Sequence, residues 1–569
     1  MGEWVKKGTA STLEDVIEKN CGMPAAELLS PEPVCPRSIR GMEELAGHVR
    51  HALAKGRKIT VVGDYDADGV TSAAILHQTM ASLGRPPSVR IPRRLSEGYG
   101  LSMKMVGEID SGLVITVDNG ISAIGEIAAL RAKGVDVCVL DHHLPGSELP
   151  DANVVVDPHI DPAYSDRHSF RHYCGAGLSY KLAELMLPGG RLLDRLAVIA
   201  AVGTVADVAP LIGDNRAIVR KGIDLIRRDA SIVPSIAAMN EMAGVCLFDE
   251  ESIGYKIGPM LNAGGRMDDD GAKLGFWLMA ASKDSAAMRE TAEKLYGMNE
   301  DRKKLMADWD VRIREIVDSE CLYGNYPLCV FADIPEGITG PIAGRLAEGL
   351  KTPVIVLARS SSEPGVIKGS GRTYGGADLR ELIRPLDGML TRVGGHASAV
   401  GLSLKAADLA GFLNSAAEFE PPDGIGDETV GYDLEIRGDK NAIAGVEQEC
   451  RKYAPFGECN PKPVFMARNV VLSPRYGQAW KTMGADGTHL KLHCDGFDIV
   501  AFGMADRYIN GLGEPLAVDF VGTVSRNRFQ YRETLQVQAI DLAASGSYVQ
   551  AAESPLLTAL AARNAAFAR

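Results

Sequence analysis

Asp64, Asp66 and Asp68 form a short acidic segment in which carboxylates occupy every second position, directly after the apolar run 59–62. Alternate residues of an extended segment point to the same side, so these side chains could present their oxygens to one volume. Carboxylates packed that closely raise each other's pKa unless a cation neutralises them, and hard oxygen donors suit magnesium or manganese. A calcium loop is excluded, because no glutamate stands at the bidentate position and residues 70–80 read as an apolar helix. The segment predicts a divalent metal site, with a solvated acidic turn as the alternative.

Polar residues able to bind a metal also follow later apolar runs. They are Asp118-Asn119 after 113–117, Asp141-His142-His143 after 135–140, and Asp207 at the end of the helical run 191–207. A single Asp after a strand is usually a helix N-cap, but three successive strands that end in metal-competent groups favour a shared site. A two-metal site for phosphoester hydrolysis could be built from Asp66, Asp68, Asp118, His142 and Asp207. Adjacent histidines cannot easily bind one ion together, so one would ligate while the other touches the phosphate or transfers a proton.

The elements that position these residues read as a parallel sheet. Short apolar runs alternate with helical segments, and the runs cover 59–62, 113–117, 135–140 and 154–156. This alternation is typical of a doubly wound α/β domain, in which ligands bind at the carboxyl ends of the strands. The predicted metal-binding residues stand at those ends.

The rest of the chain predicts further parts. The region 281–319 reads as a long charged helix that bridges globular units, and we interpret its basic residues 302–304 as a solvated helix face. A second α/β module follows, with strands 328–331 and 354–357, a helix near 342–350 and the glycine-rich stretch 393–401. Beyond residue 424, several short alternating segments predict a small barrel such as an OB-fold. The Ala-rich tail after residue 543 carries no recognisable chemistry.

Composition restricts the class of protein. The 569 residues are 46% hydrophobic and 24% charged, as in a multidomain globular protein. No apolar stretch is long enough to span a bilayer and no signal-type segment follows the charged N-terminus, so we expect no membrane partner and a cytoplasmic location. Ten cysteines without CxxC pairs favour reduced thiols over a zinc ribbon or a disulfide framework. A net charge of −13 disfavours indiscriminate coating of nucleic acid, so such binding depends on local basic patches.

Four ordered motifs resemble those of the DHH phosphoesterase superfamily. They are Asp66-Ala67-Asp68, Val117-Asp118-Asn119-Gly120, Asp141-His142-His143-Leu144-Pro145 and Gly203-Thr204-Val205-Ala206-Asp207. Further segments resemble the RecJ family of bacterial single-strand-specific DNA exonucleases, namely 63–69, 97–101, 261–266, 368–372, 394–396 and, more weakly, 455–461 and 489–491. The motifs occur in one order along the chain, which makes the resemblance specific.

The resemblance implies a fold and a domain order. It implies a doubly wound parallel-sheet DHH domain, a long helical connector, a smaller α/β DHHA1 domain and a C-terminal β-barrel with an OB-fold. The expected boundaries are 1–45 for an N-terminal segment, 46–215 for the DHH catalytic domain, 216–322 for the connector with its phosphate-contacting motif, 323–418 for DHHA1, 424–545 for the OB-fold and 546–569 for the tail.

The resemblance also implies an activity. This is manganese- or magnesium-dependent hydrolysis of single-stranded DNA from the 5′ end to mononucleotides, in DNA recombination and repair. The expected partners are single-stranded DNA, a single-strand-binding protein and a RecQ-type helicase. Asp66 would ligate one ion, Asp68, His142 and Asp207 the other, with Asp118 as the bridge and His143 on the scissile phosphate. Asp64 or water would complete the coordination, because Val62 replaces a histidine that is common in the superfamily.

Substrate contacts are expected at residues with phosphate-binding or amide chemistry. The expected set is Arg94, Asn262, Arg266, Ser370, Arg372 and His396, of which Arg266, Ser370 and Arg372 fall where the family recognises phosphates near the 5′ end. Guanidinium groups clamp phosphate bidentately, and Gly264-Gly265 would permit close backbone approach. Met260 replaces an arginine frequent in relatives, which removes one phosphate contact.

The barrel has a nucleic-acid signal of its own. Arg526, Arg528 and Phe529 combine cations with an aromatic, a pattern typical of surfaces that neutralise phosphates and stack bases. Exposed arginines on a strand are the alternative interpretation. Cys459 replaces the glycine usual in the barrel motif, which leaves the geometry of that turn open.

Two other functions compete with the exonuclease. A relative that cleaves very short oligonucleotides or cyclic dinucleotides typically lacks the barrel that residues 429–542 predict. A replication scaffold that has lost its metals need not retain Asp66, Asp68, Asp118, His142 and Asp207 together, and this chain retains all five.

Overall fold

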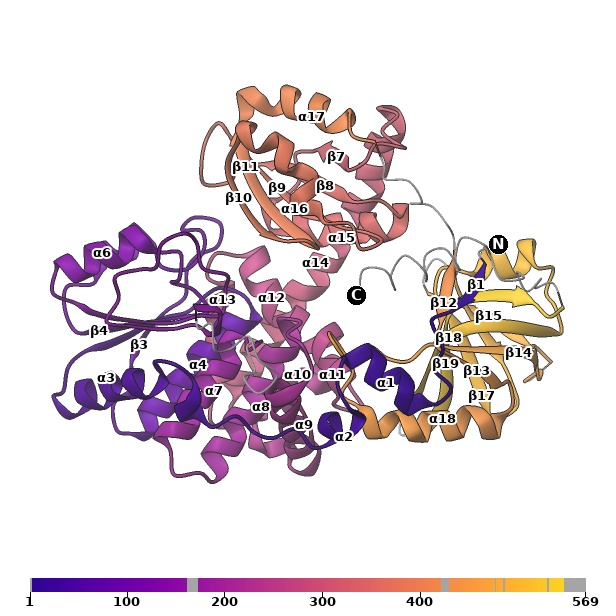
Figure 1. The fold of residues 1–569 in the computed structure, drawn as a ribbon, viewed down its shortest axis with the longest axis horizontal. Helices are drawn as coiled ribbons and strands as arrows, with labels where there is room; N and C mark the ends of the chain where they lie inside the picture. The colour runs from indigo at the N-terminus through magenta and orange to yellow at the C-terminus, as the bar shows by residue number, and fades with distance from the viewer. Residues whose placement is uncertain are drawn as a thin grey trace, which may run out of the picture. The chain divides into compact units, whose positions relative to one another are not determined.

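The computed structural model describes residues 3–160, 172–420, 429–475, 477–484, 487–529 and 532–546, without the side chains of residues 396, 529 and 532. Its contacts divide the chain into two compact units. Residues 31–426 form the central unit, and residues 1–30 together with 427–569 form the terminal unit (Figure 1). Among the described helices, none combines the length and the apolar character needed to cross a membrane.

The first part of the central unit is a parallel sheet with the order β3-β2-β4-β5-β6. Its strands are β2 (Ile59–Val62), β3 (Ser88–Arg90), β4 (Leu113–Val117), β5 (Asp136–Leu140) and β6 (Val154–Val156). Helices α3 (Met42–Ala54) and α4 (Ala67–Ser82) cover the face that buries Val61, and α5 (Met103–Glu108) and α6 (Ile124–Ala132) cover the face that buries Val114. Figure 1 shows α3 and α6 on opposite sides of the strands. The predicted doubly wound sheet is confirmed.

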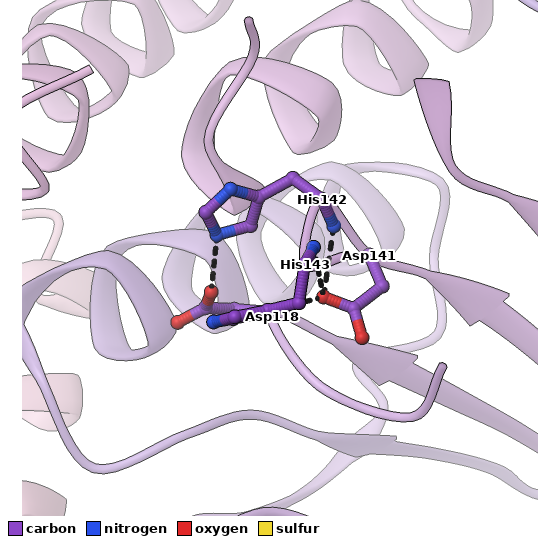
Figure 2. Close-up of side chains that lie close together, drawn as sticks. All are labelled: Asp118, Asp141, His142 and His143. Atoms are coloured by element: carbon purple, nitrogen blue, oxygen red, sulfur yellow. Dashed lines mark hydrogen bonds and ion pairs between the residues drawn. The ribbon is translucent and has the colours of Figure 1, made fainter. Parts of the chain in front are cut away.

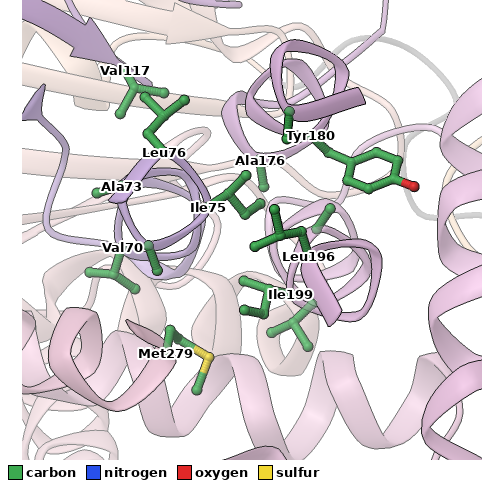
Figure 3. Close-up of a cluster of buried hydrophobic side chains, with 14 of the residues drawn as sticks. Val70, Ala73, Ile75, Leu76, Val117, Ala176, Tyr180, Leu196, Ile199 and Met279 are labelled. Carbon is green, nitrogen blue, oxygen red and sulfur yellow. The ribbon is translucent and has the colours of Figure 1, made fainter. Parts of the chain in front are cut away.

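A helical layer packs against α4. It contains α7 (Gly175–Met186), α8 (Arg191–Ala206), α9 (Gly213–Arg228), α10 (Pro234–Met242), α11 (Glu250–Ser252), a π-helical turn (Ile253–Ile257), α12 (Gly258–Met267) and α13 (Gly271–Ala280). Figure 3 shows Ile75 of α4, Ala176 of α7 and Leu196 of α8 meeting in the core. Each large aliphatic side chain buried there contributes about 1.5–3 kcal/mol. Because α4 is buried almost all round, its acidic N-terminus has a fixed position.

Helix α14 (Ala286–Ser319) leads to a second sheet with the order β10-β11-β9-β8-β7. Its strands are β7 (Leu328–Phe331), β8 (Val354–Arg359), β9 (Val366–Arg372), β10 (Leu390–His396) and β11 (Ala399–Lys405). Strands β7 and β8 are parallel, and the other neighbours pair antiparallel. Helix α15 (Thr339–Leu350) covers one face, while α16 (Leu379–Ile383) and α17 (Leu409–Ala417) cover the other. The smaller α/β module is confirmed.

The terminal unit is built on a mixed sheet with the order β13-β14-β18-β19-β17-β16-β15. Its elements are β12 (Val430–Tyr432), β13 (Leu434–Arg437), α18 (Lys440–Tyr453), β14 (Phe465–Val471), β15 (Trp480–Met483), β16 (His489–His493), β17 (Phe497–Ala501), β18 (Ala517–Phe529) and β19 (Arg532–Ala544). This agrees with the predicted OB-fold barrel. Cys459 has a left-handed backbone (φ 58°), which explains why glycine is usual at that turn.

Residues near the N-terminus belong to the same unit. Strand β1 (Trp4–Lys6) pairs in parallel with β12, and α1 (Leu13–Cys21) and α2 (Ala25–Leu29) follow it. The buried Trp4 donates a hydrogen bond from Nε1 to Asp541 Oδ2 (2.6 Å) on β19. The two ends of the described chain therefore fold together.

Candidate metal centre

The acidic segment between β2 and α4 directs its carboxylates inward. Asp64 and Asp68 are buried, and Asp66 is the N-cap whose side chain caps the first turn of α4. Asp68 accepts hydrogen bonds from Gly175 N (2.6 Å) and Ala176 N (2.8 Å) at the N-terminus of α7. Helices α4 and α7 together therefore fix the direction of the Asp68 carboxylate.

Three groups of donor atoms form around these carboxylates, and the atoms of each group lie within 4.8 Å of one another. The groups are Asp64 with Asp66 and Asp118, then Asp118 with Asp141, His142 and His143, and finally Asp68 with Cys174 and Asp207. His142 Nε2 lies 3.6 Å from Asp68 Oδ2 and so adjoins the third group. Asp118 belongs to two groups, which fits a bridging carboxylate. It also has a left-handed backbone (φ 60°), a strained state that recurs at functional sites.

Burial and charge in these groups favour a bound cation. The carboxyl groups with a raised pKa are Asp64, Asp68, Asp118 and Asp207. In each case burial is the main cause, and the charge of neighbouring carboxylates adds to it. A divalent cation removes both causes of the raised pKa, because it neutralises the carboxylates and replaces the hydration that they lose on burial. A donor set of carboxylates with one imidazole suits manganese or magnesium, so these residues fit the predicted ions.

The two histidines in Figure 2 have different environments. His142 Nε2 lies 2.9 Å from Asp118 Oδ1, and burial together with His143 lowers its pKa, which favours the neutral imidazole that a metal ligand requires. His143 Nδ1 lies 2.8 Å from Asp141 Oδ1. Burial opposes a charge on His143, but the hydrogen bond and the charge of Asp141 outweigh it and raise the pKa to about 9. The raised pKa favours the charged form of His143, which is suited to contact a phosphate.

Asp141 was counted among the metal-competent residues at the strand ends, but it was not one of the five expected ligands. Its carboxylate accepts hydrogen bonds from Ile121 N (2.9 Å), His142 N (2.8 Å) and His143 Nδ1. Burial would raise the pKa of Asp141, yet its hydrogen bond and charge interaction with His143 bring the pKa down to about 2. Asp141 thus orients and charges His143. Its place directly before the histidine pair was the available signal.

Cys174 was not predicted to lie at the site. It is the N-cap of α7, where Sγ accepts a hydrogen bond from Gly177 N (3.5 Å) and lies 3.6 Å from Thr204 Oγ1. Burial raises the pKa of its thiol, so the group stays neutral. Its observed contacts make Cys174 a helix cap beside Asp68.

The predicted phosphate-binding residues gather around the N-terminus of α15. Arg266 Nη1 donates to the carbonyl of Gly337 (3.2 Å), just before the helix. The Ser370 hydroxyl lies 3.1 Å from Thr339 Oγ1 in the first turn, and the Arg372 guanidinium packs against the same turn. A helix N-terminus flanked by guanidinium and hydroxyl groups suits a phosphate.

Positive charge collects here without carboxylate partners. Within the described part of the chain, no ion pair joins Arg94, Arg266 or Arg372 to an acidic side chain. Burial, and then the charges of Arg94 and Arg302, lower the pKa of Arg266. The Arg94 guanidinium instead lies over the Tyr65 ring, 4.7 Å from its centroid. A bound phosphate would neutralise this charge.

Helix α12 connects this cluster to the acidic segment. Asn262 Oδ1 accepts a hydrogen bond from Ala67 N (2.8 Å), which ties α12 to the first turn of α4. A Cβ at Gly265 would lie 2.8 Å from the Tyr65 carbonyl oxygen, so this glycine allows α12 to pack closely against the acidic segment. The predicted backbone approach to a phosphate at Gly264-Gly265 stays a prediction. Met260 of α12 is buried in the hydrophobic core of the central unit, so its side chain is not available to a substrate.

Arg302 departs from the interpretation of residues 302–304 as a solvated helix face. Lys303 and Lys304 are exposed and pair with acidic residues of α14, as that interpretation expects. The partly buried Arg302 guanidinium donates to Asn299 Oδ1 (2.9 and 3.2 Å) and acts electrostatically on Arg266. The interpretation is wrong for Arg302, because α14 packs against α12.

In the barrel, the predicted arginines face acidic residues. Arg526 forms ion pairs with Glu447 (2.9 Å) and Glu533 (3.2 Å), and Arg528 stands opposite Glu533 in the β18–β19 register. The side chains of Phe529 and of His396 on β10 lie outside the described residues. A different aromatic is available to bases, since Phe502 is 52% exposed. Its ring lies edge to face with His489 at 5.2 Å.

Comparison with family models supports the order of domains. Residues 58–204 match the DHH family N-terminal domain, residues 325–420 the DHHA1 domain and residues 432–541 the RecJ OB domain.

Comparison with known proteins gives matches over most of the chain. The chain is 31% identical to the single-stranded-DNA-specific exonuclease RecJ of Bacillus subtilis over 90% of its own length, although it spans only 64% of that relative. It is 31% identical to the RecJ of Thermus thermophilus, with 92% of this chain and 73% of the relative covered. A crystal structure of Thermus thermophilus RecJ in complex with Mn²⁺ matches with a TM-score of 0.74 and 28% identity, over 96% of this chain and 79% of the other.

Proposed function

This chain belongs to the RecJ family of single-stranded-DNA-specific exonucleases, and from that membership we propose that it hydrolyses single-stranded DNA from the 5′ end. The products are mononucleotides, and the reaction serves DNA recombination and repair. The proposal is carried by one observation: all five expected metal ligands lie in three adjoining donor groups, of which two share Asp118 and the third lies beside His142. A scaffold without metals would have no use for such a set of buried carboxylates, each of which is costly to hold without a cation.

Each residue of the centre has a proposed role. Asp66 would hold one manganese or magnesium ion, with Asp64 available to it, and Asp68, His142 and Asp207 would hold the other. Asp118 would serve as the shared ligand, since it belongs to two of the donor groups. When bound, such ions lower the pKa of an attacking water and neutralise the leaving oxygen. His143, charged by Asp141, donates to the scissile phosphate and holds it in place.

The arginine-rich cluster at α15 accounts for the direction of degradation. Arg266, Ser370 and Arg372 bind the terminal 5′ phosphate, and Arg94 and Arg302 add positive charge nearby. Because Asn262 ties α12 to α4, this anchor keeps a fixed relation to the metal centre. A strand gripped by its 5′ phosphate presents the next phosphate to His143. Cleavage there releases one nucleotide.

The proposal extends to partners and location. The substrate is single-stranded DNA, made accessible by a RecQ-type helicase and covered by a single-strand-binding protein, and the barrel binds the trailing strand. We place the reaction in the cytoplasm. All ten cysteines are free, which suits a reducing compartment.

The test uses a single-stranded oligonucleotide labelled at either end, with or without a 5′ hairpin, in the presence of Mn²⁺. We expect mononucleotides to appear first from the 5′ end, and the hairpin to block their release. Degradation that starts only at the 3′ end, or activity limited to dinucleotides, would refute the proposal. Asp118→Ala should abolish turnover while DNA binding persists, because the arginines and the barrel are unchanged.

A further inference from the structure

The first turn of α9 joins two chain segments that come from the metal centre. Asn215 in this turn is completely buried, and its Nδ2 donates hydrogen bonds to the carbonyl oxygens of His172 (2.7 Å) and Pro210 (3.1 Å). Its Oδ1 has no hydrogen-bond partner in the described part of the chain. The Asn215 side chain is therefore used as a double donor, and both acceptors are backbone atoms, one before α7 and one before α9.

The segment that follows His172 orients Asp68. Two backbone N–H groups at the start of α7, those of Gly175 and Ala176, donate to the Asp68 carboxylate (2.6 and 2.8 Å). A Cβ at Gly175 would lie 2.8 Å from Asp118 Cβ, so this segment also packs directly against the shared ligand. A shift of the segment would move the donors that hold Asp68.

The segment that precedes Pro210 carries Asp207. Asp207 ends α8, and the next residue, Val208, has a left-handed backbone (φ 58°), which is a strained state for a β-branched residue. Strain of this kind persists only where the surrounding structure fixes the backbone. The hydrogen bond from Asn215 to Pro210 holds the end of this turn, and with it the direction of the chain at Asp207.

The start of α9 is itself a fixed support. Asp214 accepts a hydrogen bond from the Tyr173 hydroxyl (2.6 Å) and forms an ion pair with Lys181 of α7 (2.8 Å). Asp214, Tyr173 and Lys181 are all buried. These contacts do not involve the Asn215 side chain, so they anchor α9 to α7 even when that side chain is replaced.

We propose that Asn215 is a positioning residue that sets the spacing between Asp68 and Asp207. The inference rests on the proposed function, in which these two carboxylates share one metal ion. Asn215 touches neither carboxylate and acts through the two backbone carbonyls. A primary amide carries two N–H donors on one nitrogen, whereas a hydroxyl carries one donor and a carboxylate none, so an amide suits a link between two carbonyls.

The test follows Mn²⁺ binding to the whole protein by electron paramagnetic resonance. Asn215→Ala should bind one ion like the wild type, because Asp64, Asp66 and Asp118 keep their contacts. The other ion should bind about 10- to 100-fold more weakly, the usual loss when a group that orients a metal ligand is removed. The signal of a spin-coupled ion pair, expected when one carboxylate bridges two Mn²⁺ ions, should be lost at a concentration where the wild type shows it.

Hydrogen exchange of the metal-free protein gives a readout that needs no ion. The amides of Gly175 and Ala176 should exchange faster in Asn215→Ala, because the segment before them loses its link to α9. Asn153→Ala is the control for a general loss of stability in the same unit. Asn153 Oδ1 accepts a hydrogen bond from Val137 N (2.7 Å) near the start of β5, away from the carboxyl end of the strand. This variant should leave the Mn²⁺ titration and the two amides unchanged.

A second control matches the chemistry of the change. Asn460 in the terminal unit is also completely buried, and its Nδ2 donates to two backbone carbonyls, those of Tyr453 (3.0 Å) and Pro455 (2.8 Å). Asn460→Ala removes the same kind of double link and should bind both ions like the wild type.

If Asn215→Ala does not fold, Asn215→Ser, which keeps one donor, should show the same selective loss of one ion. The inference is overturned if the folded variant binds both ions like the wild type, if both ions weaken equally, or if Asn153→Ala shows the same loss. Wild-type protein that binds fewer than two ions overturns the proposed ion pair, and with it the role of Asn215.

Discussion

Gly203 on α8 offers a severe test of how the helical layer positions the metal centre. It lies where α8 crosses α4 and α7. A Cβ added there would lie 2.4 Å from Thr71 Oγ1, 2.5 Å from Ala176 Cβ and 3.1 Å from Asp68 Oδ1. All three distances are shorter than ordinary van der Waals contact, so Gly203→Ala forces α4 and α7 away from α8. Ala176 supplies one of the two backbone hydrogen bonds that hold Asp68.

Two opposing terms set the size of the effect. Replacing glycine by alanine inside a helix ordinarily stabilises it by about 1 kcal/mol. Overpacking a close crossing costs about 1–3 kcal/mol. Gly203→Ala should therefore lower the free energy of unfolding by about 1 kcal/mol. Gly297→Ala is the matched control, since Gly297 lies inside α14 with no atom within 4 Å of the added Cβ, and it should raise stability by about 0.5–1 kcal/mol.

Hydrogen exchange of amides in α8 and α14 measures both effects, because it reports on the central unit alone in a chain of two units. Titration of Mn²⁺ followed by electron paramagnetic resonance measures the consequence for the site. Gly203→Ala should bind Mn²⁺ about 10- to 100-fold more weakly, the usual loss when a group that orients a ligand is displaced. Gly297→Ala should bind it normally. If both variants gain stability and bind Mn²⁺ alike, α8 does not set the position of Asp68.

Three predictions concern the terminal unit. Burial opposes a charge on Asp498, but hydrogen bonds with His493 and Lys491 outweigh it and lower the pKa of the carboxyl group. The stabilisation that Asp498 provides is therefore complete above the unfolded value near 3.8 and is lost as the pH falls through the lower folded value. Asp498→Asn should make the free energy of unfolding less dependent on pH in this acid range, as measured by unfolding curves at a series of pH values. Trp4→Ala should lower the free energy of unfolding of this unit by about 3–5 kcal/mol, as expected for a buried tryptophan. An unchanged melting temperature would contradict the packing of β1. Phe502→Ala should weaken single-stranded DNA binding in a fluorescence anisotropy titration more than Arg526→Ala does, because Arg526 is already paired with carboxylates.

The parallel sheet that carries the acidic residues could be predicted because its signals are local. The run 59–62 coincides with β2 and the run 113–117 with β4, since strands buried on both faces read as uninterrupted apolar segments. Parallel strands bring their carboxyl ends to one edge, so the order of strands and acidic residues along the chain is enough to predict that Asp64 and Asp118 meet. Asp207 was harder to place, since it ends a helix and its place depends on how α8 packs. The residue types at 66, 68, 118, 142 and 207 suggested a shared site, but only the packing of α8 against α4 and α7 brings Asp207 to Asp68.

Contacts between distant segments left no such signal. Strand β1 pairs with β12 more than four hundred positions away in the chain, and a three-residue strand has too few side chains to reveal its partner. Arg302 is charged and lies on a charged helix, yet the packing of α12 against α14 decides that it acts beside Arg266.

The barrel arginines show most clearly what a residue pattern omits. The sequence gives the charges at 526 and 528 and their spacing. The net charge of the surface also depends on which side chains of other elements lie on the same side of the strand. Arg526 stands opposite the buried Leu535 in the β18–β19 register, and Glu447 of α18 reaches the same side. Adjacent residues of a strand point to opposite faces, so Ser525 and Asn527 present uncharged polar groups on the side away from Glu447. The charge of Arg526 is therefore offset by Glu447 and Glu533, and a pattern of cations along a strand does not by itself predict a positively charged surface.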